Sequence, residues 1–183
     1  MKRSVIVCIC SLALSISSFP QGPTASPIAT TPPEVQRLAY YLGTWRGEGE
    51  TKGSPIGPAG KLSSTMTCDW FAGDFHLVCR GEERGPMGTR KFLNIRAYDE
   101  KTKAYTDYGI SSLGESEYSA GGSMVGNKLT FVKDLDSDVK GKSTKLRYTE
   151  VQMSPTFYTY QAEVSKDGAP WTGIAEGKYT KVM

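Results

Sequence analysis

Short turn sequences recur at close and even intervals from Leu42 onward, and this spacing constrains the fold more than any other feature. The segments between them alternate apolar and polar residues, which is typical of strands with one buried face. The turns carry glycine, aspartate, asparagine or proline, as in Ala72-Gly73-Asp74 and Gly121-Gly122. Strands are predicted near residues 42–51, 61–71, 75–83, 91–98, 104–111, 116–120, 128–134, 143–153, 157–165 and 171–182. A meander of about ten strands closes most simply into an all-β, antiparallel up-and-down β-barrel, because closure removes the exposed edges.

The first predicted strand places one large side chain and two glycines on the same face. Alternation puts Trp45, Gly47 and Gly49 on its inner face. The glycines leave room there for another group to approach closely. Before this strand, Pro33 to Tyr41 predicts a short helix, since proline is favoured in the first turn and Gly43 follows the last one.

The N-terminus has the composition of an export signal. Lys2 and Arg3 precede an apolar run that ends at Phe19 and is too short for a comfortable membrane span. We assign residues 1–22 to a signal peptide cleaved between 17 and 29, and residues 23–33 to a disordered, proline-rich leader. Residues 34–183 are then the barrel domain of an exported protein, periplasmic or secreted, with no membrane span after cleavage.

The mature domain is predicted to be almost neutral. Without Lys2 and Arg3, the chain has 20 basic residues against 19 acidic ones. Such a balance leaves no excess of positive charge that would attract nucleic acid or anionic lipid, so neither is an expected partner.

Cys68 and Cys79 face each other across two strands if residues 72–75 make the turn between them. In an exported protein this pairing favours a disulfide, and two free buried thiols are the alternative. The single histidine, His76, lies on the opposite face from Cys79 and is expected at the surface. A Cys–His pair and a Ser–His–Asp set are therefore not formed, and we predict no catalytic residues and no metal site.

Four motifs carry a resemblance to a known bacterial family. They are Leu42-Gly43-Thr44-Trp45-Arg46-Gly47-Glu48-Gly49, Thr65-Met66-Thr67-Cys68-Asp69-Trp70, Gly73-x-Phe75 and Tyr98-Asp99-Glu100-Lys101-Thr102-Lys103. With them the chain resembles domain-of-unknown-function family 1579 over roughly residues 34–182. That family has no established activity, so the resemblance implies a fold but does not indicate any reaction.

The helix followed by Gly43-x-Trp45 is more distantly similar to the calycins, which include lipocalins, fatty-acid-binding proteins and nitrobindins. This resemblance implies that Gly43 and Trp45 close one end of the barrel, with the indole packed on a basic residue of the last strand. Lys178 and Lys181 are both candidates for that residue. Nitrobindins hold haem through a histidine late in the chain, which this sequence lacks, so no haem or other cofactor is predicted.

The barrel interior is the remaining place for a function. About ten strands enclose more space than side chains must fill, so a small ligand or ordered water is expected inside. On each strand the alternate residues of one face are more apolar than those of the other. If these more apolar faces point inward, they predict a mostly apolar pocket in which tyrosine hydroxyls orient the ligand. Arg96 is expected to face water, because Leu93 and Ile95 form the more apolar phase of its strand. The predicted lining residues are Trp70, Leu77, Leu93, Ile95, Tyr108, Ile110, Phe131, Tyr148, Tyr158 and Tyr160.

Three functions follow from these observations. The leading one is a non-enzymatic, exported barrel that binds a small, largely apolar or amphiphilic molecule. The second is an interaction or structural module of the cell envelope whose barrel is filled by the same side chains. The third is an enzyme with a site at the barrel mouth, which would require buried, convergent titratable groups. None of the three determines an oligomeric state.

Overall fold

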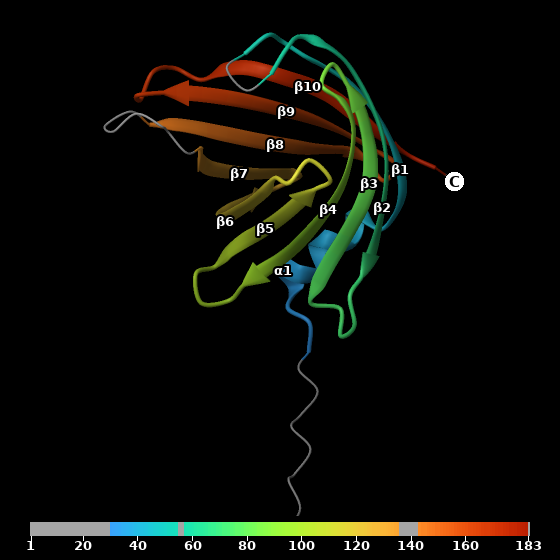
Figure 1. Cartoon of the computed structure of the whole chain (residues 1–183). Coiled ribbons are helices and arrows are strands. Elements are labelled where there is room, and N and C mark those ends of the chain that lie inside the picture. The colour runs from blue at the N-terminus through green and yellow to red at the C-terminus, as the bar shows by residue number, and fades with distance from the viewer. Residues whose placement is uncertain (1–29, 55–56, 136–142, 183) are drawn as a thin grey trace, which may run out of the picture. The chain divides into compact units, whose positions relative to one another are not determined.

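Ten antiparallel strands form a closed barrel within residues 30–54, 57–135 and 143–182, which are the residues that the computed structural model describes. Each strand pairs with its neighbours in sequence, and the first strand closes the barrel against the last (Figure 1). The elements are α1 (Pro33–Gln36), the 3₁₀ helix η1 (Arg37–Tyr41), β1 (Gly43–Thr51), β2 (Gly60–Trp70), β3 (His76–Gly85), β4 (Gly88–Asp99), β5 (Ala104–Ser111), β6 (Ser116–Val125), β7 (Lys128–Leu135), β8 (Thr144–Ser154), β9 (Phe157–Lys166) and β10 (Thr172–Lys181). The predicted all-β barrel with a short N-terminal helix is confirmed. The predicted signal peptide and most of the predicted leader lie outside the described residues.

The helical segment closes one end of the barrel. The Tyr105 hydroxyl on β5 donates a 2.9 Å hydrogen bond to the carbonyl oxygen of Glu34 in α1. From η1, the Tyr40 hydroxyl is 2.7 Å from the carbonyl oxygen of Ser154 and 2.8 Å from that of Phe157. The segment thereby joins strands from opposite parts of the barrel wall. We call this the helix-capped end and the opposite one the distal end.

Trp45 is fully buried at the helix-capped end. Its Nε1 donates a 2.7 Å hydrogen bond to the carbonyl oxygen of Tyr41, and Lys181 Nζ lies 5.3 Å from the centre of the indole. Lys178 instead extends from the outer face, where its Nζ is 3.7 Å from a carboxylate oxygen of Glu48. Of the two predicted candidates, Lys181 is therefore the one that packs on the tryptophan.

Apolar and aromatic side chains fill the half of the interior next to the helix. The Tyr158 ring is central, with its centroid 5.1 Å from that of Trp45 and 5.0 Å from that of Tyr179. Burial of each large side chain stabilises the fold by about 1.5–3 kcal/mol. The members of this core, none more than 9% exposed, are Leu38, Tyr41, Trp45, Met66, Cys68, Leu77, Cys79, Tyr105, Leu129, Phe131, Tyr158 and Tyr179.

Tyrosine rings occupy the room above the two glycines of β1. A Cβ atom on Gly47 would lie 2.6 Å from Cε1 of Tyr179, and one on Gly49 would overlap the Tyr160 hydroxyl. Because side chains of β9 and β10 lean across β1 in this way, any side chain at either glycine would displace them.

Strand β6 continues through Gly121 and Gly122, where the sequence predicted a turn. The register of β6 against β5 shifts by one residue between Tyr105 and Asp107, which is the pattern of a β-bulge. A bulge bends a strand without ending it, and glycine accommodates the bend. At Gly122 a Cβ would overlap the Phe131 ring, so the core itself also requires glycine there.

Cys68 and Cys79 form the predicted disulfide between β2 and β3. The two residues are directly opposite each other in the strand register, and both are almost completely buried. The disulfide therefore joins the two strands from inside the core.

Trp45→Ala should lower the free energy of unfolding by about 3–5 kcal/mol, because a fully buried indole leaves a cavity that the barrel end cannot refill. Urea denaturation followed by circular dichroism measures this loss. Trp171→Ala is the matched control, since it removes the same indole from a half-exposed position. Equal losses in the two variants would contradict the anchoring role of Trp45.

The mature protein should show no free thiol at Cys68 or Cys79 when it is denatured without reductant. Alkylation followed by peptide mass spectrometry gives this result directly. Replacing both cysteines by alanine should lower the free energy of unfolding by about 2–3 kcal/mol, since the bridge closes a loop of about ten residues. Quantitative alkylation of the two cysteines before reduction would show that no bridge forms.

Candidate functional site

The strand register decides which side chains face the barrel interior. Residues directly opposite each other on adjacent strands lie on the same face of the sheet. Leu77 and Cys79 belong to the core, and their partners on β4 are Arg96 and Asn94. Arg96 therefore points inward, where it is 8% exposed, and the prediction that it faces water was wrong.

Four predicted lining residues lie on the outer face instead. Leu93 and Ile95 alternate with the inward residues of β4, and Tyr108 and Ile110 alternate with the inward Asp107 of β5. Tyr108 and Ile110 are each 43% exposed. The predicted orientation failed because it followed apolarity, whereas in the middle of these two strands the charged Arg96 and Asp107 point inward.

The other predicted lining residues divide between two levels of the interior. Trp70 packs against the core at the helix-capped end and borders a hollow of about 440 Å³ on that end of the barrel. Tyr148 and Tyr160 lie farther from the helix and are half-buried. The remaining three are part of the packed core: Leu77, Phe131 and Tyr158.

A buried charge cluster crosses the interior beyond the core. Arg96 donates from Nη1 and Nη2 to the two carboxylate oxygens of Glu150, at 2.9 and 2.8 Å. Its Nε donates to Asp107 at 3.2 Å, and Asp107 also accepts a 3.2 Å hydrogen bond from Asn94. Glu150 is only 2% exposed. All three guanidinium nitrogens of Arg96 therefore bind carboxylates of this chain.

This Arg96 cluster lies directly on the aromatic core. The guanidinium carbon is 5.1 Å from the centre of the Tyr41 ring and 5.8 Å from that of Phe131. Burial disfavours the charge of Arg96, but the carboxylates of Glu150 and Asp107 outweigh this effect and hold the pKa of Arg96 well above its usual range. Burial also raises the pKa of the Tyr41 phenol. The core side chains on the helix side of the cluster are thus buried and uncharged.

On the other side of the Arg96 cluster, inward-facing side chains remain in contact with solvent. The exposed fraction of the side chain is 21% for Glu83 and 34% for Arg90, compared with at most 9% in the core. Solvent therefore reaches these inner surfaces, and this part of the barrel is less tightly closed than the core. We call it the distal half, and its half-buried members include Leu62, Phe92, Asn94, Tyr148 and Tyr160.

The charges of the distal half are paired within the chain. Arg90 Nε donates to Glu83 at 2.9 Å, and its Nη1 is 3.6 Å from a carboxylate oxygen of Glu115. Lys133 forms an ion pair with Glu117. Burial lowers the pKa of Lys133, because desolvation disfavours its ammonium form.

The Lys133–Glu117 pair spans a weakly connected part of the barrel wall. Backbone pairing between β6 and β7 is restricted to residues 123–125 and 128–130. Strand β7 nevertheless continues to Leu135 and pairs with β8 over its whole length. Side chains rather than backbone hydrogen bonds therefore connect β6 and β7 near the distal end.

Tyrosine rings form the opposite wall of the distal half. The rings of Tyr148 and Tyr160 stack at an angle of 28° with their centroids 6.0 Å apart, and the centroids of Tyr160 and Tyr179 are 5.7 Å apart. The hydroxyls of Tyr179 and Ser64 share a 2.9 Å hydrogen bond. Burial raises the pKa of Tyr179 to about 12, with a further contribution from the Glu83 carboxylate, and it raises those of Tyr148 and Tyr160 as well. These phenols are neutral donors at physiological pH.

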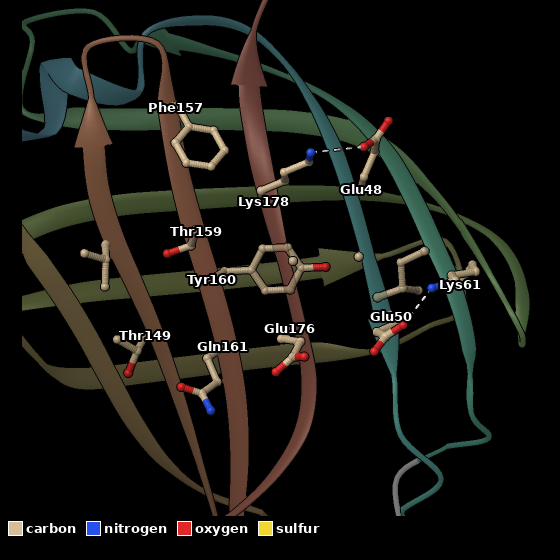
Figure 2. A pocket seen from close by; sticks show the side chains of 14 residues that line it. Glu48, Glu50, Lys61, Thr149, Phe157, Thr159, Tyr160, Gln161, Glu176 and Lys178 are labelled. Atoms are coloured by element: carbon tan, nitrogen blue, oxygen red, sulfur yellow. Dashed lines mark hydrogen bonds and ion pairs between the residues drawn. The ribbon is translucent and has the colours of Figure 1, made fainter.

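A shallow groove of about 830 Å³ lies on the outer face of strands β8, β9, β10, β1 and β2 (Figure 2). Outward threonines, Val151 and Phe157 line it, and Glu48–Lys178 and Glu50–Lys61 are ion pairs on its surface. Gly49 and Gly177 have no side chains to cover the barrel wall here, so the inward Tyr160 ring also borders the groove. Glu176, which also lines the groove, pairs with Lys52 at 3.6 Å, so this open groove carries paired surface charges.

His76, the single histidine of the sequence, lies away from both places and is exposed at the start of β3. Glu48 and Glu50 face outward and line the groove. Among the described residues, no group of three or more His, Cys, Asp or Glu side chains could hold a metal ion. The described helices are also too short to cross a membrane.

Comparisons with known proteins agree with the barrel fold. The family described as "Protein of unknown function (DUF1579)" matches residues 30–181. The crystal structure of Rv2717c from M. tuberculosis is similar with a TM-score of 0.58 and 14% identity, over 84% of this chain and 100% of that one. The S-type phycobiliprotein lyase CPES from Guillardia theta is similar with a TM-score of 0.51 and 8% identity, over 81% of this chain and 92% of that one. No curated protein sequence matches the chain.

Arg96→Met should lower the free energy of unfolding by about 3–5 kcal/mol, because Glu150 and Asp107 would remain buried without a counter-charge. Adding Glu150→Leu should recover part of this loss, since it removes the more deeply buried of the two carboxylates. Urea denaturation at pH 7 measures both variants. Arg80→Met is the control, because its 3.5 Å pair with Asp69 lies on the outer surface. A loss at Arg96 as small as that at Arg80 would contradict the role of the cluster.

Proposed function

The chain belongs to the family of proteins of unknown function DUF1579, and we propose that it is an exported, non-enzymatic protein that binds a small amphiphilic molecule in the distal half of its barrel. The sequence predicted a small, largely apolar or amphiphilic ligand, and the polar side chains that point inward favour the amphiphile. Aromatic faces of Phe92, Tyr148 and Tyr160 would contact the apolar part of such a molecule, and the inward polar groups would orient its head group.

The contrast between the two halves of the interior carries this proposal. Core side chains on the helix side are at most 9% exposed, whereas Glu83 and Arg90 retain 21% and 34% exposure although they point into the barrel. A barrel whose only role is structural would gain stability from filling that space with apolar side chains. A solvent-accessible interior lined by aromatic and polar groups is the usual composition of a small-molecule site.

Binding without catalysis is supported by how the polar groups are used. The buried titratable groups do converge, as an active site would require, but Arg96 directs its guanidinium to Glu150 and Asp107. Lys133 and Glu117 are similarly paired. Side chains that form ion pairs with each other stabilise the fold and orient a ligand, and they are not placed to transfer protons to a substrate.

Export is supported by the N-terminal sequence and by the buried disulfide between Cys68 and Cys79. Disulfides persist in oxidising compartments such as the periplasm or the extracellular space. An envelope location would expose the protein to amphiphilic molecules.

A second candidate function is an interaction module, and the outer face of β3 to β6 favours it. Adjacent outward positions carry Ile95, Tyr108 and Ile110, and Tyr118 opposite Tyr108 is 60% exposed. Exposed apolar side chains on neighbouring strands are typical of protein contact surfaces. This surface does not depend on the distal half, so the two functions can be tested separately.

Titration with the neutral dye Nile red should give a saturable fluorescence increase that Ala162→Phe removes. Ala162 points inward between Tyr148 and Ala175, so a phenyl ring there occupies the distal half. Gln161→Phe, on the adjacent outward position that lines the outer groove, should leave the titration unchanged. Thermal melts check that both variants fold.

The opposite pattern, with binding lost only in Gln161→Phe, would place the ligand in the outer groove. Native mass spectrometry of protein purified from its own envelope should also detect a retained small molecule. No dye binding and no retained mass would remove the binding function and leave the interaction module.

A further inference from the structure

The inward-facing charges are not balanced. Among the described residues of the distal half and the Arg96 cluster, three cations point inward: Arg90, Arg96 and Lys133. Four carboxylates face them, on Glu83, Asp107, Glu117 and Glu150. Glu115 adds a fifth carboxylate at the distal end, 3.6 Å from Arg90. This part of the interior therefore carries an excess of negative charge.

None of these three inward cations is available to bind an anionic head group. Arg96 uses all three guanidinium nitrogens on Glu150 and Asp107, Arg90 is held by Glu83 and Glu115, and Lys133 is held by Glu117. A carboxylate ligand would add a like charge to a partly desolvated space that is already negative. Fatty acids and similar anions are disfavoured for this reason.

The Glu83 carboxylate lies beside the tyrosine wall. Glu83 is opposite Ser64 in the strand register, and Ser64 shares a hydrogen bond with Tyr179. The Tyr160 ring reaches the same wall because Gly49 and Gly177 carry no side chains. The effect of Glu83 on the pKa of both phenols agrees with this proximity. A carboxylate next to aromatic faces and hydroxyls is suited to a cation.

The chain already places one cation in these surroundings. The Arg90 guanidinium binds Glu83 and lies 6.0 Å from the centre of the Phe92 ring. The combination of carboxylate and aromatic face thus accepts a positive charge in the folded protein.

We propose that the ligand of the distal half is an amphiphile with a positively charged ammonium head group, bound by Glu83 against the Tyr160 and Phe92 rings. This inference rests on the proposed function, because it names the ligand class of the same site. The ammonium contributes the counter-charge that the interior lacks, and the alkyl or aromatic part contacts Leu62 and Tyr148.

Three probes that differ only in the head group test the proposal: decylammonium, decanol and decanoate, titrated by isothermal calorimetry below their aggregation concentrations at pH 7. Decylammonium should bind about tenfold more tightly than decanol, and decanoate more weakly than either. Glu83→Gln should reduce the affinity for decylammonium about tenfold and leave decanol nearly unchanged.

Glu82→Gln is the matched control, because it removes the same charge from the outward position next to Glu83, where Glu82 pairs with Arg84. It should leave all three affinities unchanged. Equal effects of the two substitutions would show a general charge effect and overturn the Glu83 site.

The outcomes distinguish the ligand class from the binding function itself. Decanol or decanoate binding as tightly as decylammonium would overturn the ammonium preference and leave amphiphile binding intact. Failure of all three probes and of Nile red to bind would remove the proposed function.

Discussion

The buried ion pair between Arg96 and Glu150 is the interaction on which the organisation of the interior depends. It links β4 to β8 across the barrel, and Asp107 extends it to β5. Two charges placed so deeply are tolerated only when each satisfies the other. The pair therefore separates the packed core that holds the barrel together from the solvent-accessible half in which we propose that a ligand binds. Stability resides on one side of it and the candidate chemistry on the other.

The strand plan could be read from the sequence because it depends on local signals. Turn residues and alternation located every strand to within a few residues, and the opposed cysteines gave the β2–β3 register correctly. The exception was Gly121-Gly122, where a bulge within β6 has the same glycine signature as a turn.

The candidate site could not be read in the same way, because it depends on which face of each strand points inward. The two-residue turn of Pro86 and Met87 fixes Asn94 opposite Cys79, and that register would have placed Arg96 inside. Apolarity indicated the opposite orientation, with Leu93 and Ile95 inside, whereas these two residues lie on the outer face. Glu150, which makes the inward arginine tolerable, is 54 residues away in the sequence, and no local pattern connects the two.

Because the ladder between β6 and β7 is short, the barrel wall has a seam at which these two strands can separate locally. Residues 131–135 of β7 pair with β8 but not with β6, so this edge can separate without breaking the ladders around the core. Such an opening widens the distal half sideways while Trp45 and its neighbours stay packed. Exchange of a bound molecule then needs only a partial, low-energy fluctuation, and amide hydrogen exchange would be fastest along this seam.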